Sequence, residues 1–488
     1  MNKTIDLDMH KKVDALFVHN YYEQHFGIMQ ISAVLKQNGF TTDIAIGPRE
    51  YIIKRVLAQK PKIVGFYCTT GFHHKNIATA LEIKKILGDK ILTVFGGPHP
   101  TFVPEIIEEE GVDIVCRGEG EYAVLELMQS LKGGTDYSGI KNLTVKKDNR
   151  INKNEIRSLC DIELLPHPDR EIYEEVPYIY GNKRQEVILG RGCPFNCTFC
   201  SNHAFRGLYK EKGPYVRLRS IPKIMDELLD VKKRIKPTCF FLHDETFMLK
   251  KEYCSEFLRT YKEKINLPFG CLTRADIVTE DLIKLLKEAG CFFVTLGIES
   301  GNEKIRNQIL KKNLSDNKIL SCAKLLHKHK IPFSSFNMVG LPGESLKDVW
   351  QTVDINMQAK PMWAWFSVYQ TLPETELAHY AVEQGYLEAA NVSERDATFH
   401  EGSILLRNHP EGRKIVRIKN IANVMIKFPF LKAFVKKVVI NLPADGLYAL
   451  IDKALFFIFY YSRLTYKQGF FRTLHSAFSV ARRLKEFS

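Results

Sequence analysis

The sequence lacks the features by which secreted and membrane proteins are recognised. Its 488 residues contain no uninterrupted apolar run long enough for a transmembrane helix. Residues 1–12 are polar and charged, and they have neither the apolar core nor the small-residue cleavage site of a signal peptide. Low-complexity segments are absent, and the two halves of the chain do not look like copies of each other. These absences predict a cytoplasmic globular protein, and the length predicts two large domains with an extension.

Clustered cysteines are scarce. The chain has 11 cysteines, and most of them stand alone in apolar surroundings, where a reduced thiol behaves as a small hydrophobic group. Only Cys193, Cys197 and Cys200 lie close together in the sequence. We interpret the following isolated cysteines as buried, reduced thiols: Cys68, Cys116, Cys239, Cys271, Cys291 and Cys322.

Negative charge is scarce at one end of the chain. Residues 411–488 carry 15 Lys or Arg against 4 Asp or Glu, so +11 of the formal net charge of +14 lies there. The first 410 residues carry only +3. A basic segment at one end predicts an acidic partner that binds locally, and it argues against a nucleic-acid groove running through the whole protein.

Short apolar strands alternate with amphipathic helices from residue 13 to about residue 132. Such alternation predicts a doubly wound, Rossmann-like α/β domain over residues 1–135, with a parallel sheet that binds ligands beyond the carboxyl ends of its strands. A helix is predicted over residues 28–37, where Gly39 stops it. The predicted strands are residues 15–19, 42–46, 63–67, 92–95 and 114–116.

Residues 136–185 are predicted to be a linker, because Gly133-Gly134 opens a polar stretch and Pro166-His167-Pro168 cannot continue a helix or a central strand. A second alternating pattern covers residues 186–384. Six βα units of this spacing predict a partial (β/α)₆ barrel of the TIM type, with its chemistry at the carboxyl ends of the strands. Residues 385–488 are predicted to form a basic, α-helical extension. The predicted barrel strands are residues 186–189, 239–243, 268–272, 292–297, 333–339 and 363–369.

Three cysteines follow the first barrel strand in the sequence Cys193-Pro194-Phe195-Asn196-Cys197-Thr198-Phe199-Cys200. Thiolates at this spacing can wrap one face of a [4Fe-4S] cluster and leave the fourth iron without a protein ligand, as a chelating substrate requires. The alternatives are a zinc site, for which His203 is the local candidate for a fourth ligand, and cysteines without a common ligand. The position at the mouth of a barrel favours the cluster.

This Cys-x3-Cys-x2-Cys pattern, with the aromatic Phe199 before its last cysteine, resembles the signature of the radical SAM superfamily. The resemblance extends over the whole barrel and implies that S-adenosylmethionine (SAM) binds at the open iron. The implied SAM contacts follow successive strands: Glu245 or Asp244 for the amino group, Arg274 for the carboxylate, Glu299 and Ser300 for the ribose and amino-acid end, and Gly340 behind the adenine.

Each of these motifs alone has an ordinary explanation. Glu299-Ser300-Gly301 is a common helix start, and Leu341-Pro342-Gly343 is a common turn. Their order and spacing after the cysteines favour the family. The sixth strand departs from it, because Leu372-Pro373-Glu374-Thr375 stands where relatives often have Pro-Gly-Thr.

The first domain resembles the cobalamin-binding domain that precedes the barrel in one branch of the radical SAM enzymes. The resemblance rests on Gly96-Gly97-Pro98-His99 after the fourth strand and on Arg117-Gly118-Glu119 after the fifth. Glycines at a strand end let a bulky ligand approach the backbone. The alternative is a flavodoxin-like domain whose glycines only turn the chain. The implied cobalamin contacts are Thr69, Thr70, Gly96, Gly97, His99, Gly118 and Glu119.

No protein ligand to cobalt is predicted. The family pattern for such a ligand is Asp-x-His-x-x-Gly, whereas this chain has Gln24-His25-Phe26-Gly27. His25 stands two residues before the glycine, and no Asp precedes it by two. We therefore expect a base-off cobalamin whose lower face is open or bound to water.

The basic extension mixes Lys and Arg with large apolar side chains, most clearly in residues 426–432 and 454–461. Such a segment can lie in the headgroup region of an anionic membrane. The alternative is a helical subdomain that packs its aromatic side chains onto the barrel and leaves its cations in water. Nucleic-acid binding is not expected, because the sequence has no recognised reader motif.

The resemblance implies an enzyme with a [4Fe-4S] cluster, SAM and cobalamin, supplied with electrons by a low-potential donor of the flavodoxin or ferredoxin type. We expect reductive cleavage of SAM to a 5′-deoxyadenosyl radical and methylation of an unactivated carbon in a small-molecule or lipid-like substrate. The alternatives are a radical cyclase or oxidoreductase that acts on a tetrapyrrole or lipid, and a cobalamin or redox sensor without turnover.

Overall fold

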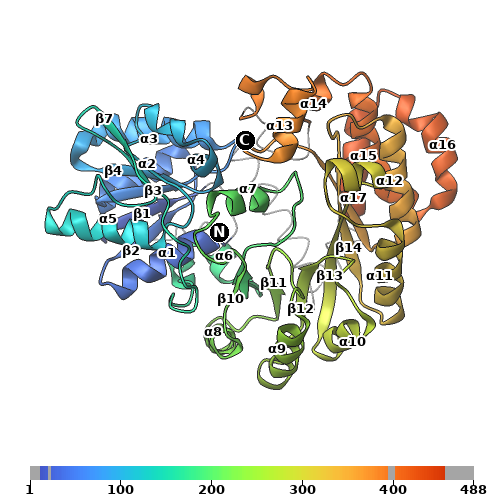
Figure 1. The fold of residues 1–488 in the computed structure, drawn as a ribbon, viewed down its shortest axis with the longest axis horizontal. Helices are drawn as coiled ribbons and strands as arrows, with labels where there is room; N and C mark the ends of the chain where they lie inside the picture. Colours follow the sequence, from blue (N-terminus) through green and yellow to red (C-terminus); the bar gives the residue numbers. More distant parts are fainter. Residues whose placement is uncertain (1–10, 20–23, 394–401, 457–488) are drawn as a thin grey trace, which may run out of the picture. The chain divides into compact units, whose positions relative to one another are not determined.

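The computed structural model describes residues 11–19, 24–393 and 402–456, and it divides into two compact units (Figure 1). The first unit contains the described residues up to 182 together with residues 204–217. The second contains residues 183–203 and the described residues from 218 onward. Each unit is built around its own large sheet, which agrees with the two domains predicted from the sequence.

The sheet of the first unit has the strand order β2-β1-β3-β4-β5-β6-β7. Strands β1 to β5 are parallel, and their order is that of a doubly wound fold in which ligands bind where the order reverses, here between β1 and β3. Each of these strands agrees with its predicted range to within one residue. The strands are β1 (Ala15–Val18), β2 (Thr42–Ala45), β3 (Ile63–Tyr67), β4 (Leu92–Gly96) and β5 (Ile114–Cys116).

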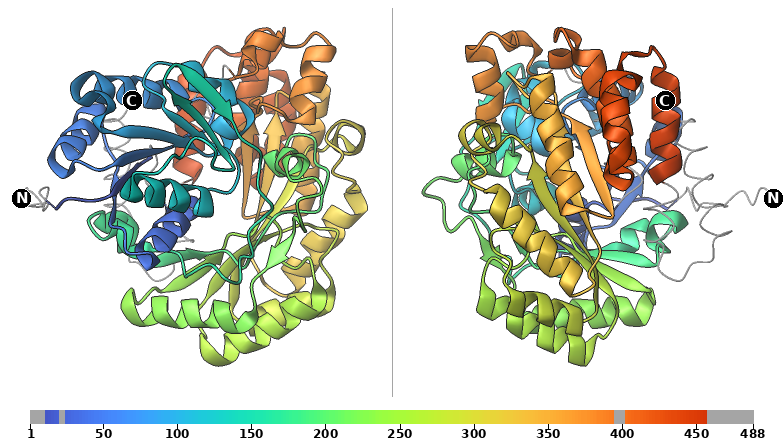
Figure 2. Two further views of the ribbon diagram at one scale, coloured as in Figure 1. Left: turned by 60° about the vertical axis from the view of Figure 1, so that its left-hand side comes forward. Right: turned by 90° about the vertical axis from the view of Figure 1, so that its right-hand side faces the viewer.

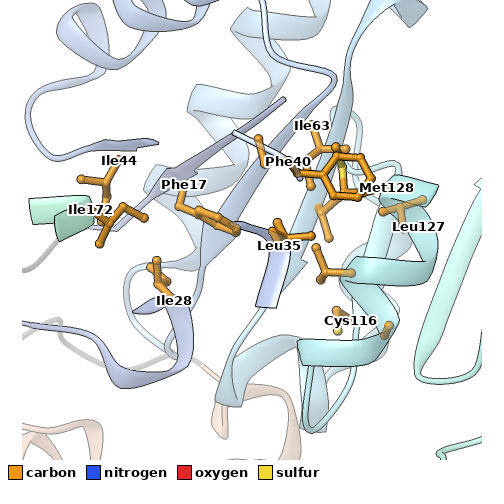
Figure 3. Close-up of a cluster of buried hydrophobic side chains, with 14 of the residues drawn as sticks. Phe17, Ile28, Leu35, Phe40, Ile44, Ile63, Cys116, Leu127, Met128 and Ile172 are labelled. Atoms are coloured by element: carbon orange, nitrogen blue, oxygen red, sulfur yellow. The ribbon is translucent and has the colours of Figure 1, made fainter. Parts of the chain in front are cut away.

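Helices cover both faces of this sheet, because its central strands are apolar on both sides. On one face, Phe17 of β1 lies close to Ile28 and Leu35 in a core that α1 and α5 enclose (Figure 3). On the other face, Val56 and Ile83 belong to a second core. Fully burying one such side chain stabilises the fold by about 1.5–3 kcal/mol. The two cores therefore hold the helices against the sheet and keep the carboxyl ends of its strands in place. The helices are α1 (Phe26–Gln37), α2 (Arg49–Gln59), α3 (His73–Leu87), α4 (Pro98–Phe102), α5 (Glu121–Gly133) and α6 (Pro177–Tyr180).

The prediction that residues 136–185 form a linker is wrong, because this segment completes the first sheet. β6 (Leu143–Lys147) pairs antiparallel with β5, and β7 (Arg150–Lys153) pairs antiparallel with β6. Leu143 and Val145 are fully buried. Apolar residues at every second position are typical of a strand, but the polar residues around these two concealed the pattern in the sequence. Asp148 and Asn149 join the two strands with φ of 50° and 58°, which Asp and Asn tolerate in a tight hairpin turn.

The second unit contains six parallel strands in the order β8-β11-β12-β13-β14-β15, which confirms the partial (β/α)₆ barrel. The predicted strands agree with it to within two residues at each end. Helices α8 to α12 lie on the outer side of the strands (Figures 1 and 2). The strands are β8 (Arg184–Val187), β11 (Cys239–Leu242), β12 (Phe269–Thr273), β13 (Cys291–Glu299), β14 (Phe333–Val339) and β15 (Trp363–Val368).

Hydroxyl side chains begin most of the barrel helices. Ser220, Thr279, Ser315 and Ser345 each accept a backbone N–H from the first turn of the helix that follows, which satisfies a donor that the helix itself leaves unpaired. The barrel helices are α8 (Ile221–Arg234), α9 (Lys251–Lys264), α10 (Glu280–Glu288), α11 (Asp316–Lys328) and α12 (Leu346–Ala359), and α7 (Ser201–Leu208) precedes them with most of its residues in the first unit.

The described part of the extension is helical, as predicted, and α15, the longest helix within that part, packs on the barrel. α15 buries Ile415, Ile418 and Met425 in a core shared with α12 and β15. Asn423 forms two hydrogen bonds with the backbone of Ala364, so α15 also satisfies part of the outer edge of β15. Within the described ranges, no helix is both long and apolar enough to cross a membrane. The helices after β15 are α13 (Glu376–Glu383), which precedes the extension, and α14 (Ile404–Arg407), α15 (Gly412–Lys427), α16 (Lys432–Lys437) and α17 (Asp445–Leu455) within it.

Candidate active site

The three predicted cluster cysteines lie in the loop after β9 (Gly190–Arg191). Cys197 is buried, whereas Cys193 and Cys200 are partly exposed. Burial, together with the proximity of Cys197 and Cys193, raises the pKa of the Cys200 thiol to about 11. Burial also raises the pKa of Cys197, although the nearby cations of Lys312 and Arg274 lower it. All three cysteines lie within an eight-residue stretch of this loop.

The loop is anchored at Thr198, which is buried. Its N–H donates to the Leu310 carbonyl (3.1 Å), its Oγ1 donates to the Ile309 carbonyl (2.7 Å), and its carbonyl accepts the Leu377 N–H (3.0 Å). Phe199, predicted as a cofactor contact, packs against an apolar cluster that includes Leu310 and Leu377. The loop therefore has a fixed course on the barrel.

The donor set fits a [4Fe-4S] cluster. In the part of the chain that the structure describes, no group of three or more His, Cys, Asp and Glu side chains gathers closely enough to bind one ion. His203, the predicted fourth zinc ligand, instead pairs with Glu376 at 4.0 Å between Nδ1 and Oε2. In a [4Fe-4S] cluster the ligating cysteines bind separate irons, so their sulfurs need not converge on one point. One buried and two partly exposed thiols in one loop meet that requirement.

Asp244 and Glu245, the two candidates for the SAM amino group, follow β11 in different surroundings. Asp244 is buried, and its Oδ1 accepts the N–H groups of Leu189 (3.0 Å) and Gly190 (2.8 Å). Burial raises the pKa of the Asp244 carboxyl to about 7. Glu245 is exposed. Asp244 thus fixes the backbone ahead of the cluster loop, which leaves Glu245 as the better candidate for SAM.

Glu299 ends β13 in a left-handed conformation, with φ of 70°, that residues other than glycine rarely adopt. Its Oε1 accepts from the Lys312 ammonium at 3.1 Å, and both residues are buried. Ser300 is also buried, and its Oγ accepts the Asn302 N–H (3.2 Å). A strained backbone beside a buried ion pair is typical of ligand sites, so Glu299 has the surroundings of a functional residue, whereas Ser300 shapes the turn.

Gly340 follows β14 with φ of 73°, and an added Cβ would lie 2.7 Å from Leu406 of α14. Its N–H donates to Oε2 of the buried Glu344 (2.7 Å). Burial raises the pKa of Glu344 to about 8. The chain therefore needs glycine here for its own packing, independently of the predicted contact with adenine.

Arg274 follows β12, as predicted for a SAM contact, but its guanidinium is directed to other partners. It donates to Cys197 Sγ, with 3.7 Å between Nη1 and Sγ. It also donates to both carboxylate oxygens of Asp276 at 3.0 Å. The structure therefore brings Arg274 to the cluster loop.

Most residues predicted to contact cobalamin lie at the carboxyl edge of the first sheet. Thr69 and Gly96 are partly exposed there. Thr70 and His99 are buried and bonded to each other, with 3.1 Å between Oγ1 and Nδ1. A Cβ on Gly97 would lie 2.8 Å from the Cys68 carbonyl oxygen, whereas a Cβ on Gly96 meets nothing closer than 3.9 Å. Position 97 thus needs glycine because the backbone of Cys68 packs against it, whereas position 96 leaves room for a ligand.

Gly118 and Glu119 are engaged within the first unit. Arg217 donates to both carboxylate oxygens of Glu119 (2.6 Å and 3.1 Å), and the Cys160 N–H donates to Oε2 (3.1 Å). The Tyr209 hydroxyl accepts the Glu119 N–H (2.6 Å) and would lie 2.0 Å from a Cβ on Gly118. Sequence reasoning missed Tyr209 and Arg217, because nothing in their local pattern connects them with the first domain.

His25 immediately precedes α1, and its ring centroid lies 3.5 Å from that of Tyr67. Its N–H donates to the Tyr173 hydroxyl (2.9 Å). Burial lowers the pKa of His25 to about 4, so the imidazole is neutral at pH 7. None of the described residues forms a hydrogen bond with its Nδ1. That His25 does not ligate cobalt stays a prediction.

Two family models match the chain. The model described as the B12 binding domain matches residues 15–128, and that of the Radical SAM superfamily matches residues 187–355. The first match covers the parallel strands β1 to β5, and the second covers most of the barrel with the cysteine loop. The matches confirm both domains and imply cobalamin, SAM and a [4Fe-4S] cluster as cofactors.

Similar proteins include methyltransferases. An uncharacterized methyltransferase of Pyrococcus horikoshii is 28% identical over 361 residues, which are 72% of this chain and 76% of that protein. The anaerobic magnesium-protoporphyrin IX monomethyl ester cyclase of Rubrivivax gelatinosus is 27% identical over 372 residues, 72% of this chain and 65% of that protein. The radical SAM methyltransferase TsrM from Kitasatospora setae, solved with tryptophan and a SAM analogue, has a TM-score of 0.61 at 17% identity and shares the fold over 76% of each chain.

Proposed function

Because this chain belongs to the cobalamin-binding radical SAM family, we propose that it is a methyltransferase that acts on an unactivated carbon. When bound, SAM with a reduced cluster supplies a 5′-deoxyadenosyl radical, and methylcobalamin supplies the methyl group. The observation that carries the proposal is the loop with Cys193, Cys197 and Cys200, anchored beside strand ends that carry Glu245 and Glu299.

In this proposal the chain positions its cofactors with groups that are already fixed. Asp244 holds the backbone of Leu189 and Gly190 ahead of the loop. Glu245, exposed at the end of β11, suits the ammonium group of SAM, and Glu299 suits its hydroxyl groups. A flavodoxin or a ferredoxin is the proposed electron donor.

Anaerobic incubation of the reconstituted full-length protein with SAM and a strong reductant tests this function. We expect 5′-deoxyadenosine from the parent protein and from His203→Ala, but none from Cys197→Ala. With SAM labelled in its methyl group, cobalamin and a lipid extract, the product should gain one labelled methyl. Stoichiometric zinc without iron in the reconstituted protein contradicts the proposal.

A radical cyclase or oxidoreductase acting on a tetrapyrrole or lipid is the second candidate, favoured by the similarity to the magnesium-protoporphyrin cyclase. Its product loses hydrogen or gains oxygen and carries no label from SAM, so the same mass spectrum separates the two reactions. A cobalamin or redox sensor without turnover is a third candidate. It predicts that the parent protein leaves SAM intact under reducing anaerobic conditions.

The C-terminal extension supports a proposal about where the enzyme works: we infer that it contacts an anionic membrane and favours an apolar, lipid-like substrate. The helical-subdomain alternative holds for α15, which packs on the barrel. Beyond α15, large apolar side chains remain exposed. We call them the apolar patch: Phe428 (42% exposed), Phe430 (79%), Phe434 (58%), Val438 (42%), Leu442 (49%), Leu447 (55%) and Leu450 (63%).

Cations accompany the apolar patch. Lys436, Lys437 and Lys453 are exposed on α16 and α17. Near an anionic surface each Lys contributes on the order of 1 kcal/mol, and each buried aromatic side chain contributes about 1.5–3 kcal/mol. The two contributions together suit an anionic lipid surface better than a neutral one. Most of the predicted membrane segment 454–461 lies in residues 457–488, outside the described residues.

Co-sedimentation of the full-length protein with phosphatidylglycerol vesicles tests the membrane proposal. We expect binding at low salt that weakens at 1 M salt, where the screening length falls to roughly 3 Å. Replacing Phe430 and Phe434 together by serine should reduce binding. Leu164→Ser is the matched control, because Leu164 is 73% exposed in the first unit. A parent protein that stays in the supernatant at low salt contradicts the proposal.

A further inference from the structure

Arg274 is enclosed by partners in the second unit. It is 6% exposed. Nε and Nη2 donate to the two carboxylate oxygens of Asp276, both at 3.0 Å, and Nη2 also donates to the Lys312 carbonyl (2.7 Å). Nη1 donates to Cys197 Sγ (3.7 Å). These contacts use four of the five N–H bonds of the guanidinium, so one N–H remains for any other ligand.

The cluster loop also covers the flat face of this guanidinium. The ring of Phe195 lies over it, with 3.7 Å between the Arg274 Cζ and the ring centroid. Phe195 stands midway between Cys193 and Cys197, so the loop contacts Arg274 both through a sulfur and through an aromatic face. A bidentate bond to a carboxylate of SAM requires two parallel N–H groups. Arg274 can offer them only by releasing Asp276 or the Lys312 carbonyl.

We propose that Arg274 serves the cluster rather than the SAM carboxylate: it is a positioning residue whose N–H bond to Cys197 stabilises the thiolate and raises the reduction potential of the cluster. The proposal rests on the proposed function in that a [4Fe-4S] cluster binds the three cysteines. Reduction adds negative charge that spreads onto the ligating sulfurs. An N–H aimed at a sulfur stabilises the reduced form more than the oxidised form.

The charges near Cys197 largely cancel, so we expect the hydrogen bond from Arg274 to have the larger effect on the reduction potential of the cluster. Asp276 neutralises Arg274, and Glu299 neutralises Lys312 with 3.1 Å between Oε1 and Nζ. The net charge close to Cys197 is therefore small in the parent protein. Removing Asp276 exposes the full charge of Arg274, and removing Arg274 deletes both the N–H and the support for Phe195. The two changes shift the potential in opposite directions.

A redox titration in the absence of SAM tests this proposal. The full-length protein is reconstituted anaerobically, and the reduced cluster is followed by electron paramagnetic resonance. In Arg274→Gln and Arg274→Lys the ratio of reduced to oxidised cluster at a fixed potential should fall, and a tenfold fall in this ratio corresponds to about 59 mV for one electron. In Asp276→Asn it should rise. Arg259→Gln on the exposed face of α9 is the control and should match the parent.

The outcomes separate the two roles of Arg274. A parent-like potential in Arg274→Gln, combined with weaker SAM binding, assigns Arg274 to SAM and overturns the proposal. If Arg274→Gln retains no cluster, the Arg274→Lys protein decides, because it keeps the positive charge and removes the guanidinium N–H aimed at Cys197: a lowered potential supports the proposal and an unchanged one overturns it. A parent protein that binds no iron contradicts the proposed function itself, which is a different result from a cluster with an unshifted potential.

Discussion

Replacing Asp244 by asparagine should remove a pH dependence from the stability of the second unit. Burial raises the pKa of this carboxyl from its usual 3.8 to about 7, so between these values the native state holds one proton more than the unfolded state. The free energy of unfolding therefore falls as the pH rises, by at most about 1.4 kcal/mol per pH unit. Summed from pH 5 to pH 7 the loss is about 2 kcal/mol, and it levels off above pH 7.

Asparagine keeps the shape and an acceptor oxygen for the N–H groups of Leu189 and Gly190, but it does not titrate. Urea unfolding at pH 5, 6, 7 and 8 measures the effect. Tryptophan fluorescence reports on the second unit alone, since all three tryptophans, Trp350, Trp363 and Trp365, lie there. The difference between parent and variant cancels other titrating groups, Glu344 among them. Equal slopes for the two proteins would refute the reasoning, because they would mean that the carboxyl titrates normally.

Three further predictions concern the cofactors and the barrel. Cys197→Ala should abolish the cluster, because two thiolates do not retain a cubane; iron analysis should give about four irons per parent chain and almost none in the variant. His25→Ala should leave the paramagnetic resonance spectrum of bound Co(II) cobalamin unchanged, and a nitrogen splitting that disappears in the variant would reveal a histidine ligand. Gly301→Ala should destabilise the barrel by about 1–3 kcal/mol, measured by calorimetry, because its Cβ would lie 2.1 Å from the Gln351 carbonyl oxygen; an unchanged melting temperature contradicts this.

The sequence was sufficient for features that depend on neighbouring residues. Both sheets were predicted, because buried parallel strands alternate with helices at a regular spacing. The cysteine loop was predicted because the spacing of its thiols is local. The β6–β7 hairpin was missed, although the turn residues Asp148-Asn149 lie between short alternating stretches that signal it.

Interactions between distant segments could not be predicted. The bond between Glu119 and Arg217 joins residues 98 positions apart, and no periodicity relates them. Lys312 follows Glu299 by 13 residues through an irregular segment, so no sequence pattern indicated that their charges meet. Such pairs form because a buried charge requires a partner, and the fold decides which partner is near.

The motif residues fall into two groups once their contacts are known. Asp244, Arg274 and Glu119 were predicted to contact cofactors, yet each is bonded to other parts of the chain. Glu245 and Gly96 remain accessible at strand ends. A charged residue in a motif can therefore act on a cofactor in two ways, by touching it or by fixing the loop that does. A residue that acts in the second way keeps all its hydrogen bonds when the cofactor binds, because it has organised the loop beforehand.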